Sequence, residues 1–168
     1  MKTILLMFGK AGCTLRTLAA LKGLPVYDKQ GNKQGHVIDL VLSEGTVTGL
    51  LITRPTLFKR TCLLALQDVI SIGPDGISAK PITNTPSLNH EQVFTLQHQR
   101  AIANQKIITD QGEELGILDD VYFNEQLGTI VAYEISNGFF SDITDGKQIV
   151  QTHEPPSLGQ DAIVISRF

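Results

Sequence analysis

The sequence predicts an all-β protein made of two tandem small antiparallel β-barrels joined by a short linker. Three observations predict this fold class: an internal duplication, strand-type segments bounded by turn residues in each copy, and a length of 168 residues that suits two small domains. Hydrophobic residues make up 42% of the chain, which is enough to build a core.

The duplication begins at residue 23. Residues 23–35 (GLPVYDKQGNKQG) match residues 104–116 (NQKIITDQGEELG) at a shift of 81 positions, and the shift grows to 83 and then 86 further along. Each increase falls where a turn is expected, so the order of matches is kept. We therefore divide the chain into four parts: an N-terminal extension expected to be flexible (1–19), a first domain (20–80), a linker (81–100) and a second domain (101–168).

Segments rich in β-branched and large apolar residues predict the strands of each domain. In the first domain they cover 26–28, 34–42, 46–53, 61–66 and 77–80, and in the second they include 129–135, 148–152 and 162–166. A short helix is expected over 91–98 in the linker. At this domain size a closed barrel is favoured over an open sheet, because closure removes exposed strand edges. Contact between the two domains is expected too, since a domain this small is marginal alone.

A β-bulge is predicted in the second strand of each domain. The apolar positions shared by both copies are 37/118, 40/121 and 42/123, and a spacing of three and then two breaks the alternation of a regular strand. A bulge at Asp39 and Asp120 restores the inward phase, and we expect each carboxylate to accept backbone N–H groups freed by the bulge. A catalytic or metal-binding role for this pair is the sharper alternative.

Recurring glycines mark the turns and bends of both copies. Gly31 and Gly35 align with Gly112 and Gly116. Gly23 aligns with Asn104, and glycine and asparagine are the residues that best tolerate a positive φ, so a left-handed backbone is predicted at this position.

Charge is unevenly distributed along the chain. Residues 1–80 carry a net +5, residues 101–168 carry −8, and the whole chain carries −3. An acidic protein is a poor candidate for strong nucleic-acid binding, which needs a dense basic face, but it can bind a basic protein such as a ribosomal one. We expect no transmembrane segment, because the apolar runs are far shorter than the ~20 residues that a spanning helix needs. With only Cys13 and Cys62, reduced thiols in the cytoplasm are the simplest interpretation.

No catalytic residue, cofactor or metal site is predicted. The four histidines (His36, His90, His98, His153) do not recur between the copies, and their spacing does not suit a metal site. Cys62 has no recurring base beside it, and phosphate-binding glycine loops are missing from the sequence.

One apolar recurrence is a candidate partner-binding site. Leu57-Phe58 in the first copy corresponds to Phe139-Phe140 in the second, and Lys59-Arg60 follows the first pair. These residues either fill the mouth of each barrel or form an exposed patch for a partner.

Three stretches of the first copy resemble the PRC-barrel family: LKGLPVY at 21–27, the Gly31, Gly35, Val37 and Asp39 pattern, and DVISIGPDGI at 68–77. The second copy looks like a divergent member that keeps Gly112, Gly116, Asp120, Gly159, Asp161 and Ile163. The resemblance implies a small β-barrel used as an interaction module, and the family has no shared catalytic set to transfer.

The leading hypothesis is a non-enzymatic adaptor that binds a protein partner through barrel loops or strand edges. One alternative is a factor associated with ribosome maturation or RNA processing, which predicts a basic stripe of Lys22, Lys29, Lys33, Lys59 and Arg60. Another is a small-ligand binder with a pocket at the barrel–barrel junction.

Overall fold

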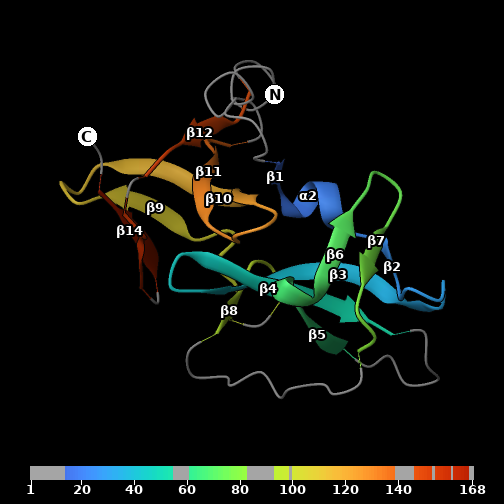
Figure 1. Cartoon of the computed structure of the whole chain (residues 1–168). Coiled ribbons are helices and arrows are strands. Elements are labelled where there is room, and N and C mark those ends of the chain that lie inside the picture. Colours follow the sequence, from blue (N-terminus) through green and yellow to red (C-terminus); the bar gives the residue numbers. More distant parts are fainter. Residues whose placement is uncertain are drawn as a thin grey trace.

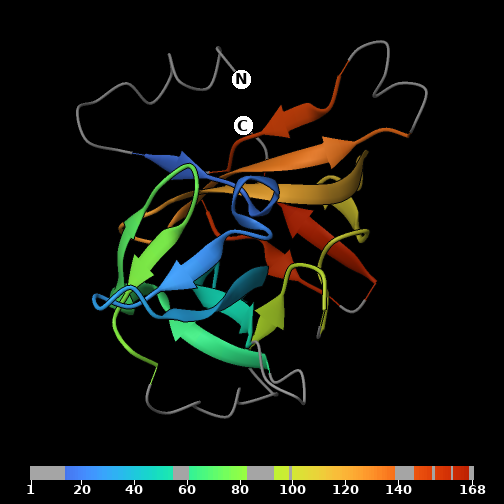
Figure 2. The same cartoon turned by 90° about the vertical axis from the view of Figure 1, so that its right-hand side faces the viewer.

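A computed structural model describes residues 14–54, 61–82, 93–98, 100–138, 146–152, 154–159 and 161–166. These residues form two seven-stranded sheets that face each other across a shared core (Figures 1 and 2). The expected all-β class with two copies of one fold is confirmed.

The first sheet has the strand order β5-β4-β3-β2-β7-β6, and β8 pairs with β3 off this path. Its strands are β2 (Pro25–Tyr27), β3 (Lys33–Ser43), β4 (Thr46–Thr53), β5 (Thr61–Ala65), β6 (Val69–Ile72), β7 (Ile77–Ala79) and β8 (Phe94–Thr95). A short 3-10 helix, η1 (Leu66–Asp68), joins β5 to β6.

The second sheet repeats this order as β12-β11-β10-β9-β14-β13, and β1 pairs with β10 off the path. Its strands are β1 (Leu15–Arg16), β9 (Lys106–Thr109), β10 (Glu114–Asn124), β11 (Ile130–Ser136), β12 (Gln148–Val150), β13 (Ser157–Leu158) and β14 (Ala162–Ile165). The one α-helix among the described residues, α2 (Leu18–Leu21), follows β1.

Two details of the expected barrels are wrong. Each sheet contains one parallel pair, β2 with β7 and β9 with β14, so the sheets are not wholly antiparallel. In the first sheet, η1 carries the chain across from β5, and the β6–β7 hairpin then brings β7 back alongside β2 in the same direction. The sheets are also not closed, because the described residues include no pairing between the end strands β5 and β6 or β12 and β13.

Strand exchange between the halves adds one short strand to the longest strand of each sheet. Along one edge, β3 pairs first with β2 and then with β8, which comes from the linker before the second domain. In the same way β10 pairs with β9 and then with β1, which comes from the N-terminal extension. Each sheet is therefore completed by a segment that precedes the other copy.

This exchange corrects the expected boundaries. Residues 14–19 fall in the extension that is expected to be flexible, but Leu15–Arg16 form β1 and Leu18 is fully buried. The helix expected over 91–98 is also wrong for its described part, because Phe94–Thr95 are a strand. Two residues that complete the edge of another copy carry no strand periodicity of their own, so the pattern of the sequence did not reveal them.

The predicted β-bulges are confirmed in both long strands. The register of β3 with β4 shifts between Val37 and Asp39, and that of β10 with β11 shifts between Leu118 and Asp120. Each aspartate accepts the N–H of the next residue, Leu40 at 2.8 Å and Val121 at 2.7 Å. The left-handed backbone predicted at the aligned pair Gly23 and Asn104 is present, with φ of 87° and 65°.

The same two aspartates also bind the other half of the molecule. Asp120 accepts the backbone N–H groups of Leu18 and Ala19 at 2.9 and 2.8 Å, across about a hundred residues of chain. Reciprocally, Asp39 accepts the N–H groups of Gln97 and His98 at 2.9 and 2.8 Å. We call these the exchanged caps, because each carboxylate accepts the N–H groups at the start of the turn that follows the exchanged strand.

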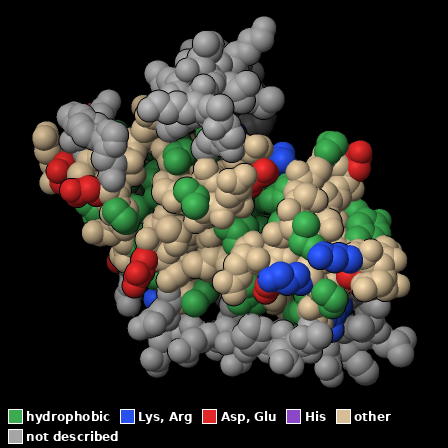
Figure 3. Space-filling model, in the orientation of Figure 1, with side chains coloured by type: hydrophobic (Ala, Val, Ile, Leu, Met, Phe, Trp, Pro, Cys, Tyr) green, Lys and Arg blue, Asp and Glu red, His purple; other side chains and the backbone are tan. Residues whose placement is uncertain are grey.

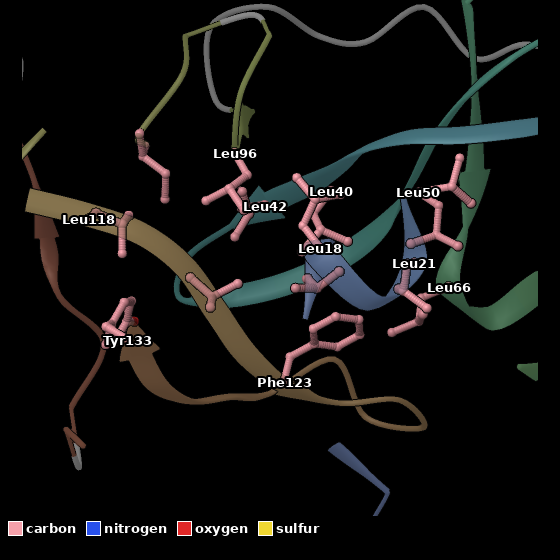
Figure 4. Close-up of a cluster of buried hydrophobic side chains, with 14 of the residues drawn as sticks. Leu18, Leu21, Leu40, Leu42, Leu50, Leu66, Leu96, Leu118, Phe123 and Tyr133 are labelled. Carbon is pink, nitrogen blue, oxygen red and sulfur yellow. The ribbon is translucent and has the colours of Figure 1, made fainter. Parts of the chain in front are cut away.

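The exchanged caps hold apolar residues in a core that runs through both halves. Leu18 and Leu21 of α2 lie between Leu40 and Leu50 of the first sheet and Phe123 of the second (Figure 4). At the equivalent position on the linker, Leu96 packs into the same cluster.

A second contact joins the two hairpin turns. Val47 donates to the carbonyl of Gly128 at 2.8 Å, and Ile130 donates to the carbonyl of Gly45 at 3.4 Å. Gly128 has φ of 73°, and a Cβ at this position would collide with the carbonyl oxygen of Val47. Glycine is thus required there both for its backbone conformation and for the close approach of the two halves.

Replacing a buried cap should destabilise the protein far more than replacing its exposed neighbour. Asp120→Ala leaves three backbone donors without their charged acceptor, so we expect a loss of about 3 kcal/mol or more in the free energy of unfolding. Asp119→Ala removes only an exposed ion pair with Lys147 and should change it by less than about 1 kcal/mol. Urea denaturation followed by circular dichroism measures both, and equal losses would contradict the role given to Asp120.

A matched pair of glycine variants tests the hairpin contact. Gly112 also has a positive φ, 84°, but a Cβ added there would meet no atom within 4 Å. Alanine at either site should cost about 1–2 kcal/mol from backbone strain. Gly128→Ala should cost about 1–3 kcal/mol more, because it pushes the halves apart. Thermal denaturation of both variants tests this, and an equal effect would show that the hairpins do not pack as described.

Candidate functional site

The residues expected to bind a partner lie outside the described part of the structure. This holds for Leu57, Phe58, Lys59, Arg60, Phe139 and Phe140. Their role stays a prediction, and the candidate site is built below from described residues.

The recurring glycines lie where the backbone conformation or a close contact requires glycine. Gly31 and Gly112 have φ of 83° and 84° in the β2–β3 and β9–β10 turns. At Gly116, φ is 133° and a Cβ would lie 2.7 Å from the carbonyl oxygen of Ser136. At Gly35, a Cβ would collide with the carbonyl oxygen of Thr53. The two later glycines thus allow the long, bent strands to lie close to their neighbours.

Asp39 and Asp120 are buried caps whose oxygens are used by backbone donors. Burial raises the pKa of the Asp120 carboxyl, while the N–H groups of Ala19, Leu18 and Val121 oppose this shift and the charge of Glu134 adds to it. The two caps differ in one respect: Nδ1 of His98 lies 2.9 Å from Oδ2 of Asp39, where the other cap has Ala20 at the matching position. Among the described residues no three His, Cys, Asp or Glu side chains gather as metal ligands.

Cys62 is a buried residue of β5 beside Arg54. Burial raises the pKa of its thiol, and the guanidinium of Arg54 offsets only part of that rise. A thiol with a raised pKa stays protonated at neutral pH, so Cys62 has the properties of a core residue rather than of a nucleophile.

A surface ion network lies on the second sheet. Nζ of Lys147 is 2.6 Å from a carboxylate oxygen of Asp119 and 3.0 Å from one of Glu134, and the hydroxyl of Tyr122 donates to Glu134 at 2.8 Å. Both carboxylates raise the pKa of Lys147, and burial together with Glu134 raises the pKa of Tyr122 to about 12. Neither group titrates near neutral pH, so this network holds β10, β11 and β12 together and offers no general acid or base.

Two clefts lie at the junction between the halves. The linker cleft, about 490 Å³, is lined by Phe94, Arg100, Ala101, Gln105, Leu158 and Gly159. The β6 cleft, about 380 Å³, is lined by all of β6 together with Leu66, Gln67, Glu125 and Gln126. They occupy related places in the duplicated fold, because Leu158 aligns with Ile72 and pairs with the equivalent residue of its sheet.

The linker cleft carries a cation and an unsatisfied polar atom. The guanidinium carbon of Arg100 lies 4.3 Å from the centre of the Phe94 ring, a cation–π contact. Oε1 of Gln105 is buried and has no hydrogen-bond partner among the described residues, while its amide nitrogen donates to the carbonyl of Ala101.

The β6 cleft is bordered by exposed apolar side chains. Ile70 in β6 is 47% exposed, and Leu127 in the β10–β11 turn, next to Gln126, is 74% exposed. Exposed large apolar residues elsewhere in the described chain are Tyr27 (38%) and Ile117 (40%). On the face drawn in Figure 3, hydrophobic side chains form small separate patches, with most of the Lys and Arg atoms on the side of the first sheet.

Comparison with known proteins agrees with this duplicated fold. The family model described as "PRC-barrel domain" matches the chain twice, over residues 15–84 and 98–167. This chain belongs to the PRC-barrel family. It is also 35% identical over 161 residues to "Uncharacterized protein YrrD" of Bacillus subtilis (strain 168), covering 91% of this chain and 88% of that protein. Neither the family description nor the name of this relative mentions a catalytic activity.

The cations that the nucleic-acid hypothesis requires fall in more than one place on the PRC-barrel fold. Lys22 follows α2 and donates to Gln97, whereas Lys29 and Lys33 lie at the β2–β3 turn on the far side of strand β2. Lys59 and Arg60 lie outside the described residues. No helix in the described residues is long and apolar enough to cross a membrane.

Sequence reasoning missed the exchanged caps, although a signal for them exists. Thr17-Leu18 recurs as Thr95-Leu96 at a shift of 78, and each threonine hydroxyl accepts the N–H of the residue three positions later, at 3.3 and 3.0 Å. The neighbouring repeat has a shift of 81, so an alignment at that shift does not place these two turns opposite each other.

The pH dependence of stability tests the environment of Asp120. An acid whose pKa is raised by folding binds more protons in the folded state, so its contribution to stability is lost as pH rises through the folded pKa. Asparagine at this position does not titrate. We therefore expect the difference in unfolding free energy between the wild type and Asp120→Asn to fall as the pH rises above about 4, the ordinary pKa of an aspartate. A difference that grows with pH would show that the three N–H donors outweigh burial.

Proposed function

We propose that this protein is a non-enzymatic adaptor that binds a protein partner through strand edges or loops of its two PRC-barrel domains. The observation that carries the proposal is the β6 cleft, which the half-exposed Ile70 lines and beside which Leu127, the neighbour of the lining residue Gln126, exposes apolar surface. Solvent-exposed apolar side chains that border a cleft are typical of surfaces that a partner covers.

The titratable groups around the site support an interaction role. Asp39 and Asp120 are engaged as caps, and Cys62 is a buried residue whose thiol pKa is raised. The polar side chains at the β6 cleft are glutamines, a serine and Glu125, which is paired with Arg16 at 2.8 Å. We place the protein in the cytoplasm on its low cysteine content.

A second candidate function is small-ligand binding at the linker cleft. Its support is the buried Oε1 of Gln105, which lacks a donor, and the nearby guanidinium of Arg100. A ligand there would be a small molecule with a hydrogen-bond donor and a negative or aromatic group. Native mass spectrometry of the purified protein separates the candidates, because only a ligand binder retains a small adduct that Gln105→Leu abolishes.

Affinity capture with paired surface variants tests the adaptor function. Ile70→Ser with Leu127→Ser removes the apolar borders of the β6 cleft, so we expect the captured partner to be lost, with at least a tenfold drop in binding. Tyr27→Ser with Ile117→Ser is the matched control, since both residues are exposed but lie away from the cleft, and it should retain capture. Cross-linking mass spectrometry of the captured complex then locates the contact.

The loop residues predicted from sequence form a third arm of the same experiment. If only Phe58→Ser with Phe140→Ser abolishes capture, the loops rather than the β6 cleft carry the interaction. Equal capture by all variants, with no cross-link to either surface, would contradict the adaptor function.

A further inference from the structure

We propose that the outer edge of β6 binds an extended, uncharged polypeptide segment by adding it to the first sheet as a further strand. This inference deepens the proposed adaptor function and rests on it. In the sheet topology, β6 is the terminal strand of its sheet and pairs with β7 alone among the described strands.

Ile70 has no partner residue in β7. The β6–β7 register pairs Val69, Ser71 and Ile72 and shifts between Val69 and Ser71, so Ile70 is the extra residue of a β-bulge, which the ladder leaves unpaired. The carbonyl of Ile72 is directed to the other side, where Nη2 of Arg16 donates to it at 2.7 Å. The backbone edge of β6 at Ile72 therefore faces the cleft, and the unpaired Ile70 lines the same cleft.

The β6 cleft follows this edge along its whole length. All four residues of β6 line it, so the edge of the strand forms the wall. The opposite wall is Glu125 and Gln126 of the other half. Because that wall stands across the edge, the cleft suits one extended segment about 13 Å long, and a second folded sheet would collide with it.

The duplicated fold supplies an internal comparison. The residues equivalent to Val69 and Ile70 in the second sheet are Pro155 and Pro156, and β13 is correspondingly reduced to two residues. Pro155 lies so close to Gly45 that a Cβ there would be 2.7 Å from the Cβ of Pro155. Proline is a common means of blocking a sheet edge. One copy of this edge is therefore blocked, and the other retains its backbone donor and acceptor beside an exposed isoleucine.

The cleft is continuous with an interface that already works by strand addition. Strand β1 adds to β10 and β8 adds to β3, each with only two residues. Arg16 of β1 donates to the carbonyl of Ile72 and to the carboxylate of Glu125, so it balances the charge of that carboxylate. With these charges balanced, the segment that fits is uncharged, has an apolar side chain to lie on Ile70 and Leu127, and has no proline opposite Ile70.

Selection from a phage-displayed library of short random peptides against the full-length protein tests this proposal. We expect enriched peptides that are extended and apolar, and that slow hydrogen exchange at the Ile70 amide at least about tenfold when bound. Ile70→Pro removes the edge N–H and should weaken their binding at least about tenfold, whereas Ile70→Val keeps it and should bind within about threefold. Proline at the equivalent Pro156 indicates that the fold accepts the substitution, and the exchange measurement on the wild type does not depend on it.

The outcomes separate this proposal from the adaptor function. If the cellular partner is lost with Ile70→Ser and Leu127→Ser but retained by Ile70→Pro, without protection of the Ile70 amide, the adaptor function stands and strand addition is wrong. A library that yields no cleft-binding peptide also overturns strand addition. If protection of Ile70 rises with protein concentration alone, the occupant is a second copy of the chain, and the proposed peptide is wrong.

Discussion

The structure depends on two buried carboxylates that each belong to one half of the molecule and bind the backbone of the other. Asp120 holds the turn at Leu18 and Ala19, and Asp39 holds the turn at Gln97 and His98. A buried carboxylate without donors, or buried N–H groups without acceptors, would cost several kcal/mol. Within its own half each carboxylate accepts the N–H of the next residue, and the other half supplies two more donors, so the two halves form one unit with a single core. This also explains how two domains of marginal size form a stable protein.

Duplication has kept these caps and let the surfaces diverge. Both copies retain the bulged aspartate and the threonine–leucine turn. The position that is Ala20 in the first turn is His98 in the second. The edge strands differ most, with Ile70 in one copy and Pro156 in the other. The fold itself explains the features that both copies share. Function is therefore carried by the differences between the copies. The proposed binding edge is a difference of this kind.

Much of the architecture could be predicted from the sequence. The broken alternation at 37, 40 and 42 predicted the bulge at Asp39, and the alignment of Gly23 with Asn104 predicted a left-handed backbone. The exchange could not be predicted by periodicity, because β1 and β8 contain two residues each. Closed barrels were wrongly expected: among the described residues the end strands β5 and β6, and β12 and β13, do not pair with each other. The candidate site at β6 was missed because the local sequence does not show which strands lie side by side. Which strand edge is left unpaired is therefore known only from the structure.

Hydrogen exchange resolved by residue in the Asp120→Ala variant tests the exchanged caps most directly. Removing this carboxylate from the second sheet should abolish protection at the amides of Leu18 and Ala19 and reduce it at Leu40 and Leu50 of the first sheet, which pack against α2. If the caps join the halves, loss of protection crosses from one half to the other. Loss confined to β10 and its neighbours in the second sheet, with the first sheet unchanged, would contradict this dependence.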